Sequence, residues 1–331
     1  MAIINGRPVG ILGTGMKMPE RVVTNQDLEK IVDTSDEWIV TRSGIRERRI
    51  AAEGESNAVL SAAAAEGAMR DAGVSPEEVD MLIVGTNSPD TLFPGVGPTV
   101  QNMIGASRAG AMDVQAGCPG ALFAMVAGAG GVASGIWDNV VVIGSEVISP
   151  MVDQTDRNTC VLFGDGAAAC LLGQWRPGAL RITHADLKAE GEYGGLITFP
   201  AGLSAEPASE ETVRERRHFV KMHGREVFKY VNRELPGYLT NFCESCGITV
   251  DDVDCWIFHQ ANIRVLEGVF RRMGVPLEKA VINLDRYGNT SAASIMLALH
   301  EARAGRIREG QRVIISSFGA GFTYGAVLAV S

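Results

Sequence analysis

The fold is decided by a pattern that occurs twice in this chain. Residues 73–87 read GVSPEEVDMLIVGTN and residues 247–262 read GITVDDVDCWIFHQAN. Each stretch has a turn, an acidic segment that can cap a helix, and then Val-Asp leading into an apolar run. The two stretches are about 174 positions apart, roughly half the chain. A repeat of this length predicts a duplicated α/β unit.

Two further pairs of segments repeat in the same register. DNVVVIGSEVIS at 138–149 resembles EGQRVIISSFGAG at 309–321, and AMDVQAGCPGALFAM at 111–125 falls opposite VINLDRYGNTSAASIM at 281–296. Apolar runs such as MLIVG, VVVIG and RVIIS are typical of strands buried on both faces, and helical patterns alternate with them. We therefore expect a layered α/β fold with two pseudo-symmetric halves.

The halves should be tightly fused, because the sequence contains no long linker. We place the N-terminal half at residues 1–173 and the C-terminal half at residues 174–331. The most polar stretch, at about 201–220, is expected to be a surface excursion that precedes the helix MHGREVFKYVNRELPGYL.

Composition narrows the class of protein. The chain has 331 residues, is 46% hydrophobic, and carries a net charge of -9. This charge argues against a general nucleic-acid binder, and any acidic partner must dock on a local basic patch. The sequence shows neither a signal peptide nor a membrane-spanning apolar segment, so we expect a cytosolic protein that does not enter a membrane. Its six cysteines are few and sit mostly in apolar runs, as reduced cysteines do.

One cysteine stands at a corner suited to chemistry. Residues 116–125 read AGCPGALFAM, which places Cys118 between a glycine and a proline at the start of an apolar helix. Unpaired N–H groups and the positive end of a helix dipole stabilise a thiolate. Cys118 is therefore a candidate nucleophile. The same pattern is also expected for a cysteine that only fills space under a helix.

The second half supplies possible partners for this cysteine. The strand VDCWIF ends at His259, and the corner opposite Cys118 carries Gly-Asn-Thr-Ser with Asn289. Each residue alone has an ordinary structural explanation, a core histidine or a helix cap. Equivalent strand ends converge in a pseudo-symmetric fold, so together they predict a Cys-His-Asn site.

The motifs in these segments resemble those of a known family. AGCPGALFAM, HQANIRV, RYGNTSAAS and SFGAGFTYG, with LEKIVDTSDEWIVTRSGIRERRI at 28–50, resemble β-ketoacyl-acyl-carrier-protein synthase III, the initiating condensing enzyme of bacterial fatty acid synthesis. The match runs from about residue 9 to the C-terminus. The resemblance implies a thiolase-like fold with five layers (αβαβα) and a homodimer.

The resemblance also implies a reaction, a decarboxylative Claisen condensation. Cys118 would accept an acyl group from acyl-CoA, and His259 and Asn289 would bind the thioester carbonyl of malonyl-acyl carrier protein. The backbone N–H groups of Cys118 and Ala320 would stabilise the tetrahedral oxyanion. This chemistry implies no cofactor and no metal, with coenzyme A entering as part of the substrate.

Further positions match the substrate contacts of the family. Trp38, Arg42 and Arg157 correspond to residues that contact the adenine end of coenzyme A. Phe93 corresponds to a residue that reaches across the dimer to close the partner's acyl pocket. The acyl carrier protein would dock on a basic patch: Lys229, Arg264, Arg271 and Arg272. Such a patch suits an acidic partner even on an acidic protein, because the field that matters is local.

Departures from the family pattern leave alternatives open. Pro119 stands where the family more often has alanine, which removes one N–H at the helix terminus, and Ala320 replaces a more usual glycine. Specialised relatives prime polyketides, accept dicarboxylic acyl groups, or transfer acyl groups to an alcohol or amine without decarboxylation. A non-catalytic acyl-binding subunit is a further alternative of a different class. A thiolase is disfavoured because the SFGAGFT turn lacks a second cysteine.

Two motif-like stretches do not indicate other functions. GILGTG at 10–15 has the spacing G-x-x-G-x-G, which differs from that of the dinucleotide fingerprint. The pair Cys243 and Cys246 has CxxC spacing without a second pair or a nearby histidine, so helix packing before Gly247 explains it better than a zinc or redox site.

Overall fold

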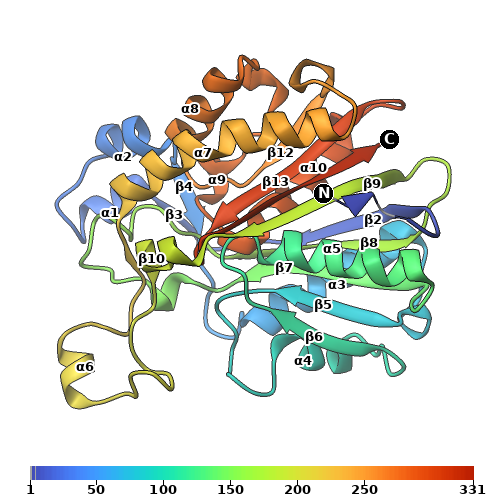
Figure 1. Cartoon of the computed structure of the whole chain (residues 1–331). Helices are drawn as coiled ribbons and strands as arrows, with labels where there is room; N and C mark the ends of the chain where they lie inside the picture. Colours follow the sequence, from blue (N-terminus) through green and yellow to red (C-terminus); the bar gives the residue numbers. More distant parts are fainter. Residues whose placement is uncertain (1, 4) are drawn as a thin grey trace.

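The structure is a computed structural model that describes residues 2, 3 and 5–331. Its strands form one path of hydrogen-bonded neighbours, β12-β13-β14-β9-β2-β8-β7-β5-β6, with β1 paired to β9 (Figure 1). The strands of the first half are β2 (Val9–Lys17), β5 (Met81–Gly85), β6 (Gly110–Val114), β7 (Asn139–Glu146) and β8 (Gly166–Gln174). Those of the second half are β9 (Leu180–Ala189), β12 (Cys255–Phe258), β13 (Arg312–Gly319) and β14 (Thr323–Val330).

The two halves repeat one topology. In the first half, β5 pairs parallel with β7, β7 antiparallel with β8, and β8 antiparallel with β2. The second half repeats these directions: β12 pairs parallel with β13, β13 antiparallel with β14, and β14 antiparallel with β9. In the first half, β5 also pairs parallel with β6 on its other side. In the second half, the equivalent strand β12 has only a single parallel bridge there, between Trp256 and Ala280. The sequence repeat therefore corresponds to a structural repeat, joined where β2 pairs with β9.

Helices separate and cover the two halves of the sheet. The longer helices are α3 (Asn57–Ala72), α4 (Val96–Met103), α5 (Gly120–Ser134), α7 (Gly224–Ser245), α8 (Ile263–Met273) and α10 (Ser294–Gly305). Helices α5 and α10 contact strands of both halves and share one apolar core with them. Helices α3 and α4 pack with the outer face of the first half, and α7 and α8 with that of the second. These are the five layers expected.

Smaller elements connect and extend these strands and helices. They are β1 (Ala2–Ile3), β3 (Val22–Thr24), β4 (Glu47–Arg49), β10 (Ile197–Thr198), β11 (Lys221–Met222), α1 (Asn25–Glu29), α2 (Asp36–Ser43), α6 (Glu210–Arg214) and α9 (Leu284–Tyr287). Short 3-10 helices are η1 (Pro76–Glu78), η2 (Ser149–Met151), η3 (Gly191–Leu196), η4 (Val250–Asp252), η5 (Leu277–Lys279) and η6 (Ser291–Ala293).

The structure confirms the predicted surface excursion. Helix α6 stands away from the body of the molecule in Figure 1, and Leu203 and Val213 in this segment are exposed. The packing explanation for the CxxC pair also holds, because Cys243 is buried in the core and Cys246 closes α7 before Gly247. Within the described residues, no helix is long and apolar enough to cross a bilayer. The boundary between residues 173 and 174 stays a prediction.

Candidate active site

Cys118 lies in the connection between β6 and α5, directly beside the turn that follows β13. Gly117 has φ +63°, and a Cβ at this position would lie 2.5 Å from the carbonyl oxygen of Ala320. Only glycine allows this close approach. The Gly120 N–H donates to the Gly117 carbonyl at 2.9 Å, and α5 starts at Gly120, two residues after the cysteine. The local sequence thus sets the thiol against the Gly319-Ala320-Gly321 turn.

One short segment links the three predicted catalytic residues. Asn289 begins it, and the Ser291 hydroxyl donates to Cys118 Sγ at 3.4 Å. Three residues later, Ser294 Oγ lies 2.6 Å from His259 Nδ1. The start of α10 and the turn before it therefore hold residues from both halves of the protein at one place. The sequence predicted Cys118, His259 and Asn289 here, but neither serine.

The environment of His259 makes its imidazole neutral. It follows β12, is 1% exposed, and stacks edge-on against Phe318 with ring centroids 5.2 Å apart. Burial lowers the pKa of His259 to about 3. A neutral imidazole can donate one hydrogen bond and accept another. The Gln260 N–H donates to Ser294 Oγ at 3.5 Å, so Ser294 can use its own proton to donate to His259 Nδ1. Nδ1 is then the acceptor of the ring, and the imidazole proton lies on Nε2.

Asn289 is held by its backbone and by one amide oxygen. Its N–H donates to the Leu162 carbonyl at 2.8 Å, and its carbonyl accepts from Gly164 at 3.0 Å. Its Oδ1 accepts from the Ser291 N–H at 2.9 Å. This bond fixes the amide, with Nδ2 as the group that remains for a ligand.

The thiol of Cys118 differs in one respect from the sequence expectation. Burial raises the pKa of Cys118 to about 11, and the buried Glu146 carboxyl acts in the same direction. Hydrogen bonds from the Ser291 hydroxyl and from the backbone N–H groups of Cys118 and Ala320 act in the opposite direction. The helix terminus alone therefore does not produce a resting thiolate, because desolvation outweighs it.

A cavity of about 630 Å³ adjoins these residues. Trp38 and Arg42 of α2 line it, as does Arg264 at the start of α8. Asn289 and Phe318 line it too, and they contact Ser291 and His259 respectively. The cavity therefore extends from two of the predicted adenine-side residues, Trp38 and Arg42, to one predicted catalytic residue, Asn289. Its volume suits an extended small molecule.

Two arginines lie over the indole of Trp38. The guanidinium carbon of Arg157 is 4.9 Å from the ring centroid, and that of Arg42 is 5.8 Å away. Arg157 also donates to the Asp33 carbonyl at 2.7 Å and forms an ion pair with its carboxylate at 3.5 Å. The structure thus groups all three predicted adenine-side residues at a half-exposed aromatic surface beside positive charge.

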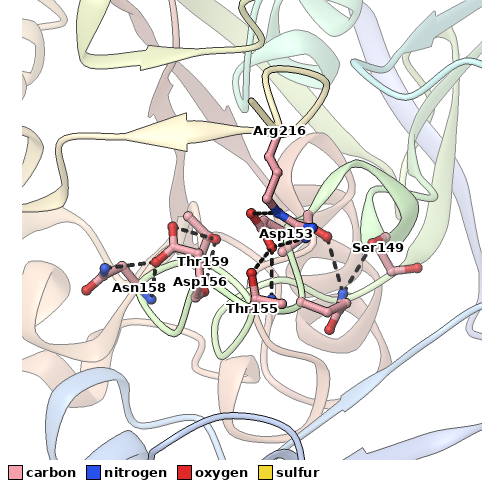
Figure 2. A network of polar contacts seen from close by, with 9 residues as sticks. Ser149, Asp153, Thr155, Asp156, Asn158, Thr159 and Arg216 are labelled. Atoms are coloured by element: carbon pink, nitrogen blue, oxygen red, sulfur yellow. Dashed lines mark hydrogen bonds and ion pairs between the residues drawn. The ribbon is translucent and has the colours of Figure 1, made fainter. Parts of the chain in front are cut away.

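A polar network shapes the loop that carries Arg157 (Figure 2). Asp153 accepts from the Thr155 N–H at 2.9 Å and from Arg216 Nε at 2.7 Å. The Arg216 guanidinium holds the pKa of Asp153 well below its usual range. Arg216 belongs to the surface excursion and has φ 55°, an unusual value for a residue with a side chain. The excursion is thereby fastened to the loop beside the cavity.

Comparison with known proteins identifies the family. The chain is 48% identical to a β-ketoacyl-[acyl-carrier-protein] synthase III from Symbiobacterium thermophilum over 322 residues, which cover 97% of each protein. This chain belongs to the 3-oxoacyl-[acyl-carrier-protein] synthase III family. Residues 112–191 match the family described as 3-oxoacyl-[acyl-carrier-protein (ACP)] synthase III, and residues 243–330 match its C-terminal part. It is therefore an acyltransferase of the condensing-enzyme type.

Solved structures of synthase III enzymes share the fold. The Aquifex aeolicus protein has a TM-score of 0.89 at 39% identity, over 98% of this chain and 100% of that one. The Thermus thermophilus protein has a TM-score of 0.88 at 42% identity, over 97% and 99%. The thiolase-like fold predicted from the sequence is confirmed.

Two groups of predicted synthase III residues lie on the surface. Phe93 is 81% exposed in the loop between β5 and α4, next to the 70% exposed Leu92. The predicted docking residues lie on the adjacent helices α7 and α8, and all are exposed: Lys229, Arg264, Arg271 and Arg272. Lys229 pairs with Glu226 at 3.0 Å. Roles for both groups remain predictions, since each requires a second molecule.

Some residues at the site escaped the sequence prediction. Arg225 lines the cavity at the start of α7, and Ser291, Ser294 and Glu146 form hydrogen bonds around Cys118 and His259. The serines were visible in the motif RYGNTSAAS, but nothing in it shows where a hydroxyl points. Glu146 ends the apolar run VVVIGSE, and the only sequence signal for it was a carboxyl at the end of a strand expected to be buried.

Proposed function

We propose that the chain condenses an acyl-CoA starter with malonyl-acyl carrier protein, with loss of carbon dioxide, to give a 3-oxoacyl-acyl carrier protein. The observation that carries this proposal is the meeting of Cys118, His259 and Asn289 through segment 289–294. Relatives named β-ketoacyl-[acyl-carrier-protein] synthase III, 40–48% identical over nearly the full length, support it. The reaction would start fatty acid synthesis in the cytosol.

In the loading step, Cys118 attacks the acyl-CoA thioester. Its sulfur forms a new thioester while the bond to coenzyme A breaks and coenzyme A leaves as the thiol. The backbone N–H groups of Cys118 and Ala320 both hydrogen-bond the sulfur, which supports their proposed role as donors to the oxyanion. Coenzyme A would lie in the cavity, with its adenine against Trp38.

In the condensing step, His259 and Asn289 bind the malonyl thioester oxygen. The neutral His259, protonated on Nε2, and the Nδ2 group of Asn289 supply two donors. Loss of carbon dioxide places negative charge on that oxygen, and donors fixed in a buried site stabilise this enolate more than the ground state. The enolate carbon then attacks the acyl carbon on Cys118. The new C–C bond forms, the C–S bond to Cys118 breaks, and the Cys118 sulfur leaves and is protonated again. These steps use side chains and backbone N–H groups and no cofactor.

The direct test supplies the purified protein with acyl-CoA and malonyl-acyl carrier protein. We expect equal amounts of carbon dioxide and 3-oxoacyl-acyl carrier protein, and neither product with Cys118→Ala. Transfer of the acyl group without carbon dioxide release would contradict the proposal and favour acyl transfer to an alcohol or amine. Normal activity of Cys118→Ala in the presence of a partner enzyme would favour the non-catalytic alternative.

The acyl carrier protein is proposed to dock on α7 and α8. Reversing charge with Arg271→Glu and Arg272→Glu should raise the KM for malonyl-acyl carrier protein about tenfold and weaken its dependence on salt. The rate of acylation by acyl-CoA should stay unchanged. Arg70→Glu, at an exposed position on α3, is the matched control. Equal effects of all three substitutions would indicate net charge rather than a docking patch.

The exposed Phe93 supports a proposed homodimer. An aromatic side chain with this exposure is costly in water and suits an interface. If Phe93 closes the partner's acyl pocket, Phe93→Ala should change which acyl-CoA is preferred. Light scattering should give a mass of twice 35.2 kDa. A monomer with full activity would overturn this part of the proposal.

A further inference from the structure

Glu146 is a buried carboxyl that the proposed steps do not use. It ends β7 and is 0% exposed. It accepts from Ser88 Oγ at 2.6 Å, from Asn87 Nδ2 at 2.7 Å and from the Asn87 N–H at 3.1 Å. Longer contacts of 3.4 Å come from Thr86 Oγ1 and the Ala292 N–H. None of these partners is a cation. These neutral donors satisfy the carboxylate but do not neutralise its charge, so its burial keeps a cost that a role in chemistry would explain.

Ser291 connects this carboxyl with the nucleophile. Its Oγ lies 3.4 Å from Cys118 Sγ, and the same side chain hydrogen-bonds Glu146. The single hydroxyl proton can be donated to only one of these groups, and when Glu146 receives it the oxygen can accept from the Cys118 S–H. Asn87 Nδ2 braces the arrangement, since it donates to Glu146 Oε1 at 2.7 Å and to Ser291 Oγ at 3.3 Å. A single hydroxyl therefore lies between a thiol and a carboxylate, with its position set by a third residue.

The backbone of Ser291 adds a second, independent observation. It has φ 47°, in the left-handed region that glycine occupies more readily than any other residue. Ser291 is also 2% exposed, so its side chain is not there for solubility. A serine kept in a conformation that suits glycine indicates that the hydroxyl has a use.

His259 is poorly placed to take the proton of Cys118. Its Nδ1 is occupied by Ser294 Oγ at 2.6 Å, and its Nε2 is required as a donor in the condensing step. Burial further lowers its basicity, whereas burial raises the pKa of Glu146 and makes that carboxylate a stronger base. The thiol proton, which the folded protein retains at neutral pH, needs another acceptor.

We propose that Ser291 and Glu146 form a proton relay that deprotonates Cys118 during acyl loading. This inference rests on the proposed function, because it assigns residues to the loading step. Ser291 touches the reacting sulfur and is a catalytic residue in this scheme. Glu146 acts through Ser291, and Asn87 positions both.

The relay balances as follows. As Sγ attacks the acyl carbon, its S–H bond breaks and the proton passes to Ser291 Oγ, while the Ser291 proton passes to a Glu146 oxygen. The new S–C bond forms and the tetrahedral intermediate then loses coenzyme A by breaking the other S–C bond. The proton returns from Glu146 through Ser291 to the departing sulfur, which leaves as a thiol. Glu146 is again a carboxylate, and Cys118 is acylated.

The test separates the two half-reactions. Acylation of Cys118 is followed by quenched-flow mass spectrometry with acetyl-CoA, propionyl-CoA and isobutyryl-CoA. Condensation is followed separately, from enzyme acylated beforehand, with malonyl-acyl carrier protein. Ser291→Gly and Glu146→Gln should slow acylation about 100-fold, the usual contribution of a proton-transfer group, and change condensation by less than about threefold. Ser145→Ala is the matched control, since Ser145 is buried on β7 and its hydroxyl has no hydrogen-bond partner among the described residues.

Melting temperature distinguishes chemistry from folding. Glycine suits φ 47°, so Ser291→Gly should melt at or near the temperature of the wild type while loading slowly. Glu146→Asp keeps a carboxylate and should load faster than Glu146→Gln but slower than the wild type. If Glu146→Gln does not fold, the loading rate of Glu146→Asp takes its place in the test. The solvent isotope effect on acylation by the wild type, measured in mixtures of water and deuterium oxide, should indicate the transfer of two protons. Ser291→Gly should lose this two-proton isotope effect.

Two results would overturn the relay. One is acylation by Ser291→Gly and Glu146→Gln at the rate of the wild type. The other is an equal loss in both half-reactions together with a lower melting temperature, which would indicate a structural role only. Failure of the wild type to accept an acyl group from any of the three thioesters would instead contradict the proposed function, and the loading relay with it.

Discussion

The imidazole of His259 and the hydroxyl of Ser294 are joined by a 2.6 Å contact between Nδ1 and Oγ. Ser294 is the first residue of α10, so this helix sets the orientation of the histidine that follows β12. The contact predicts that Ser294 selects the tautomer with a proton on Nε2.

Removing this hydroxyl should impair condensation selectively. With Ser294→Ala, the neutral imidazole can carry its proton on either nitrogen, so fewer molecules present an Nε2 donor to the enolate oxygen. We expect condensation to slow about tenfold while acylation of Cys118 is unaffected. Ser294→Thr, which keeps the hydroxyl, is the control. Equal rates for Ser294→Ala and the wild type would show that another group fixes the ring.

The low pKa of His259 predicts a specific loss of stability in acid. The imidazole stays neutral in the folded protein down to about pH 3, whereas it becomes protonated near pH 6.5 in the unfolded chain. The unfolded state therefore binds more protons between these values, and stability falls as pH falls through this window. From pH 7 to pH 5, this one group should lower the free energy of unfolding by about 2 kcal/mol.

Urea titrations at several pH values can isolate that contribution. The variant His259→Asn lacks the titrating group and should lose about 2 kcal/mol less than the wild type over the same interval. Parallel pH profiles for the two proteins would show that His259 does not keep a depressed pKa.

The arrangement of Trp38 and Arg157 predicts a defect in substrate binding. Trp38→Ala removes the ring under the Arg157 guanidinium, and we expect the KM for acyl-CoA to rise about tenfold with little change in kcat. Arg181→Ala removes a comparable contact, between Arg181 and Trp175, and serves as the control. A fall in kcat without a change in KM would argue against a role in binding coenzyme A.

The bond between Asp153 and Arg216 predicts coupling between the excursion and the cavity. Asp153→Asn removes the charge that holds Arg216, which should expose residues 201–220 to limited proteolysis. The loop that carries Arg157 should loosen as well, so the KM for acyl-CoA should rise several-fold at an unchanged kcat. Asp138→Asn, which weakens an exposed pair with Arg7, is the control. Unchanged cleavage and KM would mean that the network in Figure 2 is not needed to hold the excursion.

The sequence predicted those features that depend on local pattern. Repeated apolar runs identified strands such as β5 and β12, and the repeat then implied equivalent topologies and a shared edge for Cys118 and His259. Gly117 and Pro119 located the corner before α5, because backbone restrictions act over a few residues. The burial of Cys243 on the packed face of α7 was predictable for the same reason.

Features that depend on long-range packing were not predictable in this way. Burial decides the pKa of Cys118, and a helix terminus read from sequence cannot weigh that cost. The directions of the Ser291 and Ser294 hydroxyls follow from how η6 and α10 pack against the strands around them, which for α10 come from both halves. Asp153 meets Arg216 across a surface excursion whose path the sequence leaves open.

Cys118 as the acyl acceptor is the central claim, and intact mass spectrometry tests it most directly. The purified wild type and Cys118→Ala are each exposed to acyl-CoAs that range from acetyl through branched, long-chain and dicarboxylic. We predict that the wild type gains the mass of one acyl group per chain with at least one donor, that the modification maps to Cys118, and that Cys118→Ala gains none. An equal gain in the variant, or no gain in either protein with any donor, would contradict the account.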